Sequence, residues 1–179
     1  LVPHLDLDAV DARLSEIRAR DARNGVLVVS EGLFSMDSDW PDVAALQDIC
    51  HRHGATLLLD VAHDFGALGP GGTGSVGRAG RLGAIDLVMG SFSKTFASNG
   101  GFLASRIPAV TRFVRYFSGP HVFSNALSPL QAAAARAALR VVRSPEGAVL
   151  RDRNARASAA LRLACEARGL RVLGQVSPI

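Results

Sequence analysis

The sequence of 179 residues has almost no lysine, although it is not short of positive charge. Lysine and arginine together number 20, and because Lys94 is the single lysine, the other nineteen are arginines. Arginine serves for solubility and ion pairing, whereas only a lysine amine can lose its proton and attack a carbonyl group. The near absence of lysine therefore raises the question of whether Lys94 is a nucleophile.

Other absences limit the function classes. The two cysteines, Cys50 and Cys165, lie far apart in helical patterns, which predicts buried free thiols in a reducing compartment. No spacing of metal ligands is present, so we expect no metal site. No apolar run approaches the roughly 20 residues of a spanning helix, and no signal pattern opens the chain. The net charge of +4 is scattered without interleaved aromatics. We expect a soluble, cytoplasmic protein that binds neither nucleic acid nor membrane.

The apolar patterning predicts helices that alternate with strands. Apolar residues recur at helical spacing over 6–23, where Asp6 can cap, and over 41–53, 128–143 and 145–168. Short apolar runs predict strands at 25–32, 55–60, 84–91 and 100–105, and the last segment, 169–179, is typical of a strand entering another region. This alternation predicts an α/β fold with a mainly parallel sheet covered by helices on both faces. The chain does not begin with Met, which is typical of a piece of a longer protein.

Polar clusters follow the predicted strands. They comprise residues 31–35, 60–63 and 91–94. In parallel sheets ligands bind at the carboxyl ends of the strands, so we expect these clusters to form one site. Alone, Asp60 at a strand end is typical of a turn residue, and a single His63 is typical of a hydrogen-bonded structural group.

Two motifs have formal matches to other chemistries. GTGSVG at 72–77 matches the dinucleotide fingerprint, but it does not follow a strand, so a loop beside a pocket is the better interpretation. Ser91 to Lys94 matches the S-x-x-K signature of penicillin-binding enzymes, whose second lysine is missing from this chain. Both alternatives stay open at this point.

Together the polar clusters contain the groups that pyridoxal phosphate (PLP) needs. Its aldehyde requires a lysine, its ring nitrogen a carboxylate, and its phosphate hydroxyl and backbone donors. Lys94, Asp60, Ser91 and Ser93 supply these groups, and His63 is placed to contact the ring oxygen or a substrate.

Four stretches resemble, in order, the α-oxoamine synthases of the fold-type-I PLP enzymes. They are SEGLFSMDSDWPDVAALQDIC, HGATLLLDVAHDFGALGPGGTG, DLVMGSFSKTFASNGGFLAS and HVFSNALSPLQAAAA. The family includes 8-amino-7-oxononanoate synthase, serine palmitoyltransferase, 5-aminolevulinate synthase and 2-amino-3-ketobutyrate CoA ligase. The resemblance implies the large domain of a fold-type-I PLP transferase, and a homodimer.

The resemblance also implies individual roles. Lys94 would carry the cofactor as a Schiff base, Asp60 would pair with the ring nitrogen, and His63 would contact the phenolic oxygen and orient the substrate. These three are the expected catalytic residues. The expected cofactor-binding residues are Ser35, Asp60, His63, Ser91, Ser93, Lys94 and Ser124, with Ser124 reaching the phosphate across a dimer interface. Most members carry an acidic residue where this sequence has Val61.

The implied reaction is a condensation of an amino acid with an acyl thioester on CoA or a carrier protein, usually with loss of carbon dioxide. Residues 1–170 would be the central part of the large domain, and 171–179 the start of a C-terminal small domain. The alternatives are an aminotransferase or amino-acid lyase of the same fold, and a non-catalytic assembly domain of a larger synthase.

Overall fold

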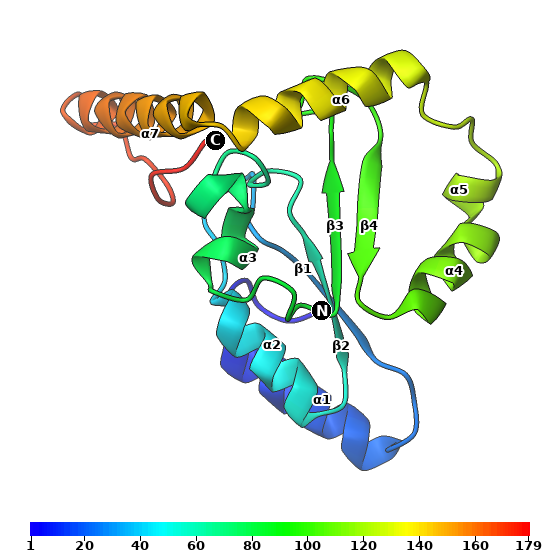
Figure 1. Cartoon of the computed structure of the whole chain (residues 1–179). Coiled ribbons are helices and arrows are strands. Elements are labelled where there is room, and N and C mark those ends of the chain that lie inside the picture. The colour runs from blue at the N-terminus through cyan, green and yellow to red at the C-terminus, as the bar shows by residue number, and fades with distance from the viewer.

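The computed structural model describes all residues from 1 to 179, and a four-stranded sheet lies at its centre (Figure 1). The strands lie side by side in chain order. The first three run parallel, and the fourth pairs antiparallel with the third. This confirms the predicted α/β class and the four predicted strands. They are β1 (Leu27–Glu31), β2 (Thr56–Asp60), β3 (Leu87–Ser91) and β4 (Gly101–Ser105).

Polar side chains fix where the helices begin. Asp6 accepts a hydrogen bond from Ala9 N at 2.8 Å and caps α1 (Leu7–Arg20). Ser128 and Gln131 form a reciprocal capping box at the start of α6 (Pro129–Val142). The four predicted helices are confirmed, with ends within three residues. The other elements are α2 (Val43–Arg52), the 3₁₀ turn η1 (Pro70–Gly72), α3 (Gly74–Arg78), α4 (Pro108–Phe117), α5 (Gly119–Val122) and α7 (Pro145–Glu166).

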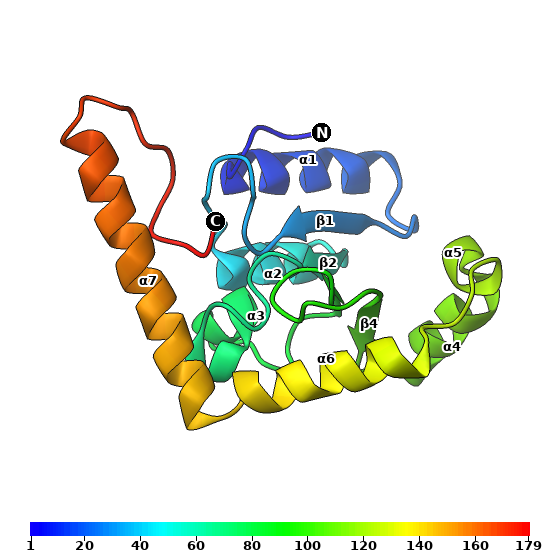
Figure 2. The same cartoon turned by 90° about the horizontal axis from the view of Figure 1, so that it is seen from above.

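The two faces of the sheet differ in their cover. Leu57 and Leu59 of β2 are fully buried in a core that also draws on α1, α2 and α3, and Figure 2 shows α2 and α3 on one side of the strands. On the other face, Leu27 and Val29 of β1 are 56% and 61% exposed. We call these the core face and the open face. The predicted cover on both faces is therefore wrong for this chain, because its N-terminal helices all contribute to one core.

The C-terminal segment contains no strand, contrary to the prediction for residues 169–179. Instead, it lies against the turn that follows β1. Gln175 N donates to Ser38 O at 2.8 Å, and the hydroxyls of Ser38 and Ser177 lie 2.6 Å apart. A strand needs a partner edge, and the turn offers these residues only isolated hydrogen bonds.

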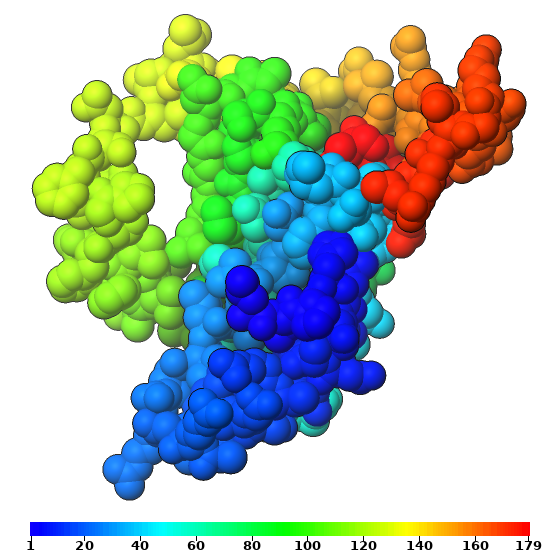
Figure 3. Space-filling view, turned by 180° about the vertical axis from the view of Figure 1, so that it is seen from behind, coloured from blue at the N-terminus to red at the C-terminus, as the bar shows by residue number.

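An arm formed by α4, α5 and the loop up to residue 128 projects from the sheet. Figure 3 shows an opening between this arm and the sheet. None of the residues of α4 or α5 is buried, and Phe113, Phe117 and Phe123 are 63%, 73% and 90% exposed. The arm therefore presents a large apolar surface that nothing in this chain covers.

Two further sequence predictions concern cysteines and membranes. Both cysteines are free, as expected, but only Cys50 is buried, because Cys165 lies on α7 with its side chain partly in solvent. Burial raises the pKa of the Cys50 thiol to about 11, with a smaller contribution from the charge of Asp86. No helix is long and apolar enough to cross a membrane.

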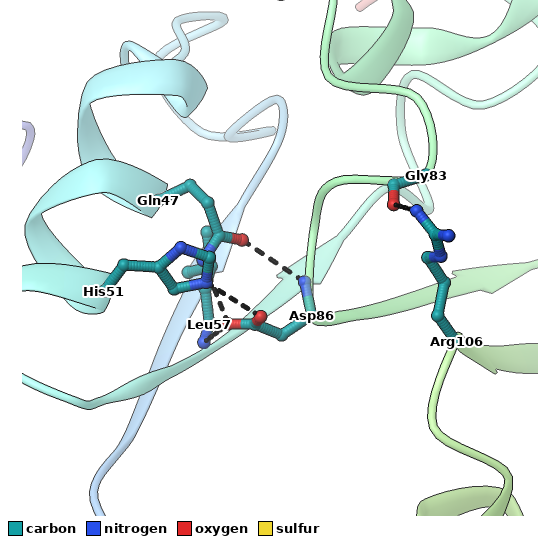
Figure 4. Close-up of polar contacts among 6 residues, drawn as sticks. All are labelled: Gln47, His51, Leu57, Gly83, Asp86 and Arg106. Carbon is teal, nitrogen blue, oxygen red and sulfur yellow. Dashed lines mark hydrogen bonds and ion pairs between the residues drawn. The ribbon is translucent and has the colours of Figure 1, made fainter.

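Asp86 fastens the amino ends of the strands to α2 (Figure 4). Its Oδ2 accepts hydrogen bonds from Gln47 Nε2 and Leu57 N, each at 2.9 Å, and its Oδ1 lies 3.0 Å from His51 Nε2. Burial opposes ionisation, but these hydrogen bonds prevail and lower the pKa of Asp86. Gln47 is only 1% exposed, whereas the side chains of His51 and Asp86 are 54% and 23% exposed, so the network runs from the interior to the solvent.

We expect Asp86→Ala to lower the free energy of unfolding by about 2–4 kcal/mol, because Leu57 N and Gln47 lose their acceptor. Asp86→Asn should cost less, since its amide oxygen can still accept. The folded pKa lies below the usual 3.8, so the carboxylate stabilises the fold at neutral pH. The difference in the free energy of unfolding between wild type and Asp86→Asn should therefore shrink as pH falls below about 4. Urea unfolding from pH 3 to 7 measures both effects, and a constant difference would contradict the assignment.

Candidate active site

The predicted polar clusters meet at one edge of the sheet. Glu31 pairs in register with Asp60, and Asp60 with Met89, so the carboxyl ends of β1, β2 and β3 lie side by side. In Figure 1 the β3 arrow ends beneath α6, at this same edge. The parallel order thus gathers segments that are distant in the sequence.

Asp60 lies on the open face. Side chains alternate along a strand, so Asp60 points away from the core that holds Leu57, Leu59 and Val61. Its Oδ1 accepts a hydrogen bond from Ala62 N at 2.8 Å, and its Oδ2 makes none. One carboxylate oxygen is therefore oriented by the protein while the other is available to a ligand.

His63 follows in the turn after β2. It is half-buried, and its imidazole makes no hydrogen bond to another protein group. The alternative of a hydrogen-bonded structural histidine therefore loses its support. Its neighbour Val61 is 2% exposed and belongs to the apolar core, so an acidic residue at that position would have no place here.

Lys94 lies in a tight loop between β3 and β4. Ala97 N donates to Lys94 O, and Ser98 N donates to Phe92 O, each at 2.9 Å. Ser98 Oγ also donates to Gln131 O at 2.8 Å, which ties the loop to α6. The Lys94 side chain itself is exposed and has no hydrogen bond or ion pair within the chain.

Aromatic side chains anchor this loop from the core face. Phe96, 2% exposed, stacks on Phe65 with ring centroids 4.9 Å apart, and Phe92 meets Phe102 at 5.7 Å. Phe92 and Phe96 point inward on either side of Lys94, which leaves the lysine on the outside. Ala97 has φ of 47°, a left-handed conformation that strains a residue with a Cβ and marks a tightly constrained turn.

Ser91 and Ser93 lie together beside Lys94. Their hydroxyls are 2.6 Å apart, and Ser93 N donates to Ser91 Oγ at 3.1 Å. Two hydroxyls and a nearby backbone N–H at the end of a strand make a suitable cradle for an anion such as a phosphate.

No hydrogen bond links Ser35 or Ser124 to this group within the chain. Ser35 follows β1 at the same edge, but it lines a separate cavity of about 320 Å³ with the end of α7 and the C-terminal segment. Ser124 is exposed on the arm and makes no hydrogen bond. The sequence could not reveal these placements, because they depend on long-range packing and on what meets the arm.

The competing motifs lack the required context. GTGSVG spans the end of η1 and the short helix α3, and neither follows a strand directly. A cavity of about 580 Å³ lies between the core face and α6, and its lining is mainly hydrophobic and contains none of the predicted site residues. His4, Asp37 and Asp39 meet, with ligand atoms within 4.8 Å of one another, but His4 already pairs with Asp39 at 3.0 Å.

Sequence reasoning missed Asp64, which is fully buried beside His63. Its Oδ2 accepts a hydrogen bond from Ser75 N at 2.5 Å. The sequence contained one signal for it, a carboxylate placed directly after a histidine in a strand-end motif.

The groups at the carboxyl edge fit PLP. The edge presents an accessible amine at Lys94, a free carboxylate oxygen at Asp60, two paired hydroxyls at Ser91 and Ser93, and an imidazole without a partner at His63. Lys94 Nζ, Asp60 Oδ2 and the His63 imidazole make no hydrogen bond within the chain, as expected of groups that contact a ligand.

Comparisons with known proteins agree with this donor set. The profile of the aminotransferase class I and II family matches residues 2–179. A putative 8-amino-7-oxononanoate synthase 2 of Mycobacterium tuberculosis is 41% identical over 160 residues, which cover 89% of this chain and 20% of the relative. The 8-amino-7-oxononanoate synthase of Geobacter sulfurreducens is 37% identical over 177 residues, covering 99% of this chain and 44% of that protein.

A solved structure shows the same fold. A variant of serine palmitoyltransferase from S. paucimobilis, with a bound PLP–myriocin aldimine, superposes with a TM-score of 0.86 at 32% identity, covering 94% of this chain and 42% of that chain. The chain thus spans less than half the length of these relatives. It belongs to the aminotransferase class I and II family, and within that family it is similar to the α-oxoamine synthases of the fold-type-I PLP enzymes.

Proposed function

We propose that the protein containing this chain condenses an amino acid with an acyl thioester, on CoA or on a carrier protein, in a PLP-dependent and usually decarboxylative reaction. The observation that carries the proposal is that Lys94 and Asp60 lie at the carboxyl ends of neighbouring strands, with an amine and a carboxylate oxygen that make no hydrogen bond within the chain. The relatives' names support the acyl-transfer chemistry over other reactions of the fold.

PLP, when bound, supplies an electron sink for a carbanion at the amino acid α-carbon. The chain's residues do the rest. Lys94 Nζ would hold the cofactor and then, once displaced, remove the α-proton as a general base. Asp60 Oδ2 would keep the ring nitrogen protonated, while Ala62 N fixes the carboxylate through Oδ1. His63 would orient the substrate carbonyl, and Ser91 and Ser93 would donate to the phosphate.

The test uses the full-length parent, loaded with PLP and mixed with a panel of amino acids and acyl-CoA thioesters. We expect free thiol to appear, measured with a thiol reagent, together with carbon dioxide. Keto-acid formation without thiol release would show an aminotransferase, and cleavage products without thiol a lyase. No turnover and no visible PLP band would indicate an assembly domain.

We further propose that residues 1–170 are the central part of the large domain and that 171–179 begin the C-terminal small domain. Coverage of less than half of the relatives' length supports a partial domain, and the end of α7 at Glu166 supports a boundary soon after that residue. A cytoplasmic location is supported by two free cysteines, neither of which forms a disulfide.

We propose that a second copy of the protein covers the arm and makes a homodimer. Phe113 and Phe117 stack with centroids 4.9 Å apart, and Tyr116 beside them is 69% exposed. Such an aromatic surface is typical of an interface core. A partner at this surface would also give Ser124, which lies far along the same arm, a route to the neighbouring subunit's phosphate site.

We expect Phe117→Arg in the full-length parent to shift the protein from dimer to monomer, because a charge replaces a ring at the centre of the surface. Sedimentation velocity measures the change, and PLP affinity should fall with it if Ser124 acts across the interface. Leu82→Arg is a matched control, since Leu82 is similarly exposed, at 63%, but lies near the amino ends of the strands. If the Phe117→Arg variant still sedimented as a dimer, this result would contradict the proposal.

A further inference from the structure

Asp64 is a buried acidic residue next to the candidate site. It follows His63 in the turn after β2, and its side chain is fully buried. Its Oδ2 accepts a hydrogen bond from Ser75 N at the start of α3, at 2.5 Å. Its backbone also belongs to the turn, because Asp64 N donates to Val61 O at 3.3 Å and Leu68 N donates to Asp64 O at 2.9 Å.

Two glycines show how closely these segments approach one another. A Cβ added at Gly32, the first residue after β1, would overlap Ser75 Oγ and lie 2.9 Å from Asp64 Oδ2. A Cβ at Gly74 would lie 3.1 Å from the same oxygen, and Gly74 has φ of 69°, which favours glycine. The Asp64 carboxyl group and the Ser75 side chain therefore fill the space between the turn after β1 and α3, and a side chain at Gly32 or Gly74 would not fit.

No cation pairs with this carboxyl group. On α3, Arg78 stacks over the Trp40 ring at 4.0 Å instead. In the turn after β1, Asp37 and Asp39 lie beside His4. Burial raises the pKa of Asp64. Hydrogen bonding to Ser75 opposes this rise, and the negative charge of Asp60 adds to it. The Oδ1 atom of Asp64 and the Oγ atom of Ser75 are both buried without a partner.

A buried carboxyl group in this state costs stability, and proteins retain such groups mainly where function requires them. We propose that Asp64 is a positioning residue of the cofactor pocket. Its carboxyl group accepts the hydrogen bond from the start of α3 and packs closely against Gly32 in the turn after β1. These contacts hold the backbone next to His63 and so set the position of the His63 imidazole. Because that imidazole has no protein partner, its place depends on its backbone. The inference rests on the proposed function.

The first test compares Asp64→Ala and Asp64→Asn in the full-length parent. Asp64→Ala removes the acceptor for Ser75 N, so we expect His63 to lose its contact with the cofactor and the dissociation constant for PLP to rise by about tenfold. The visible circular dichroism of bound PLP, which reports its orientation, should weaken. Asp64→Asn keeps an acceptor for Ser75 N and should restore most of both signals. Asp152→Ala, an exposed acid on α7, is the control.

Wild-type affinity and dichroism in Asp64→Ala would overturn the proposal. An Asp64→Asn variant as impaired as Asp64→Ala would also overturn it, because the hydrogen bond from Ser75 N needs an acceptor and not a charge. Failure of the wild-type protein itself to bind PLP would instead refute the proposed function.

The second test uses the protein without PLP and therefore does not depend on turnover. Because the pKa of Asp64 is raised in the folded protein, ionisation of its carboxyl group lowers the free energy of unfolding. This loss of stability begins as pH rises above about 4, where the carboxyl group ionises in the unfolded chain. Asp64→Asn cannot ionise, and its midpoint of urea unfolding should exceed that of wild type at pH 7, with the gain vanishing near pH 4. A gain that is absent at pH 7 would overturn the assignment of a buried, unpaired carboxyl group, even if Asp64→Ala fails to fold.

Discussion

Replacing Lys94 with arginine should abolish covalent attachment of PLP in the full-length parent and lower turnover by about 10³-fold or more. Arginine keeps the positive charge, and the exposed position of Lys94 leaves room for the larger side chain. It has no amine that can lose its proton, so neither the bond to the cofactor nor the proton transfer is possible. The visible absorbance of the lysine-bound cofactor should disappear, and borohydride reduction should no longer fix PLP on the loop peptide.

Ser93→Ala serves as the comparison for Lys94→Arg. It removes one of the two paired hydroxyls but leaves the amine, so PLP should bind more weakly and still attach covalently. If Lys94→Arg retained the absorbance band, Lys94 would not be the attachment site, and a lysine outside residues 1–179 would have to be sought.

Asp60→Asn should lower turnover by a similar factor, about 10³-fold, with a much smaller effect on PLP attachment. The amide oxygen can still accept from Ala62 N, so the turn after β2 should persist. The variant lacks the negative charge that keeps the cofactor's ring nitrogen protonated. Steady-state thiol release measures turnover, and the visible spectrum measures attachment on the same sample.

Glu31→Gln is the matched control for Asp60→Asn. Glu31 ends β1 as Asp60 ends β2, and the two residues pair in register and so point to the same face. If the effect came from any negative charge at this edge, the two variants would be equally impaired. A loss confined to Asp60→Asn supports a specific contact, whereas unchanged turnover would exclude the role of Asp60.

The sequence predicted the strand ends well because local signals determine them. Short apolar runs defined β1 to β4, and Asp6 caps α1 as predicted. Once the strands were parallel, Asp60 and Lys94 had to meet at one edge. These predictions needed only periodicity, capping and the rule for ligand position in parallel sheets.

Long-range packing explains what the sequence did not predict. The open face could not be predicted, because the apolar sequence pattern of a strand such as β1 does not depend on whether a helix of the same chain or another segment covers it. Residues 169–179 have the composition of a strand but no free sheet edge beside them. Asp64 was not predicted because its burial and its hydrogen bond depend on Gly32 and Ser75, which are distant in the sequence.

The Asp86 network and the Lys94 loop occupy opposite ends of β3. Five residues of strand, at about 3.3 Å each, separate them by roughly 17 Å, which exceeds the distance over which substitutions usually couple. Effects of changes at the two ends should therefore simply add. The amino ends of the strands can then be redesigned for thermal tolerance, or can drift in evolution, without altering the chemistry at the carboxyl ends.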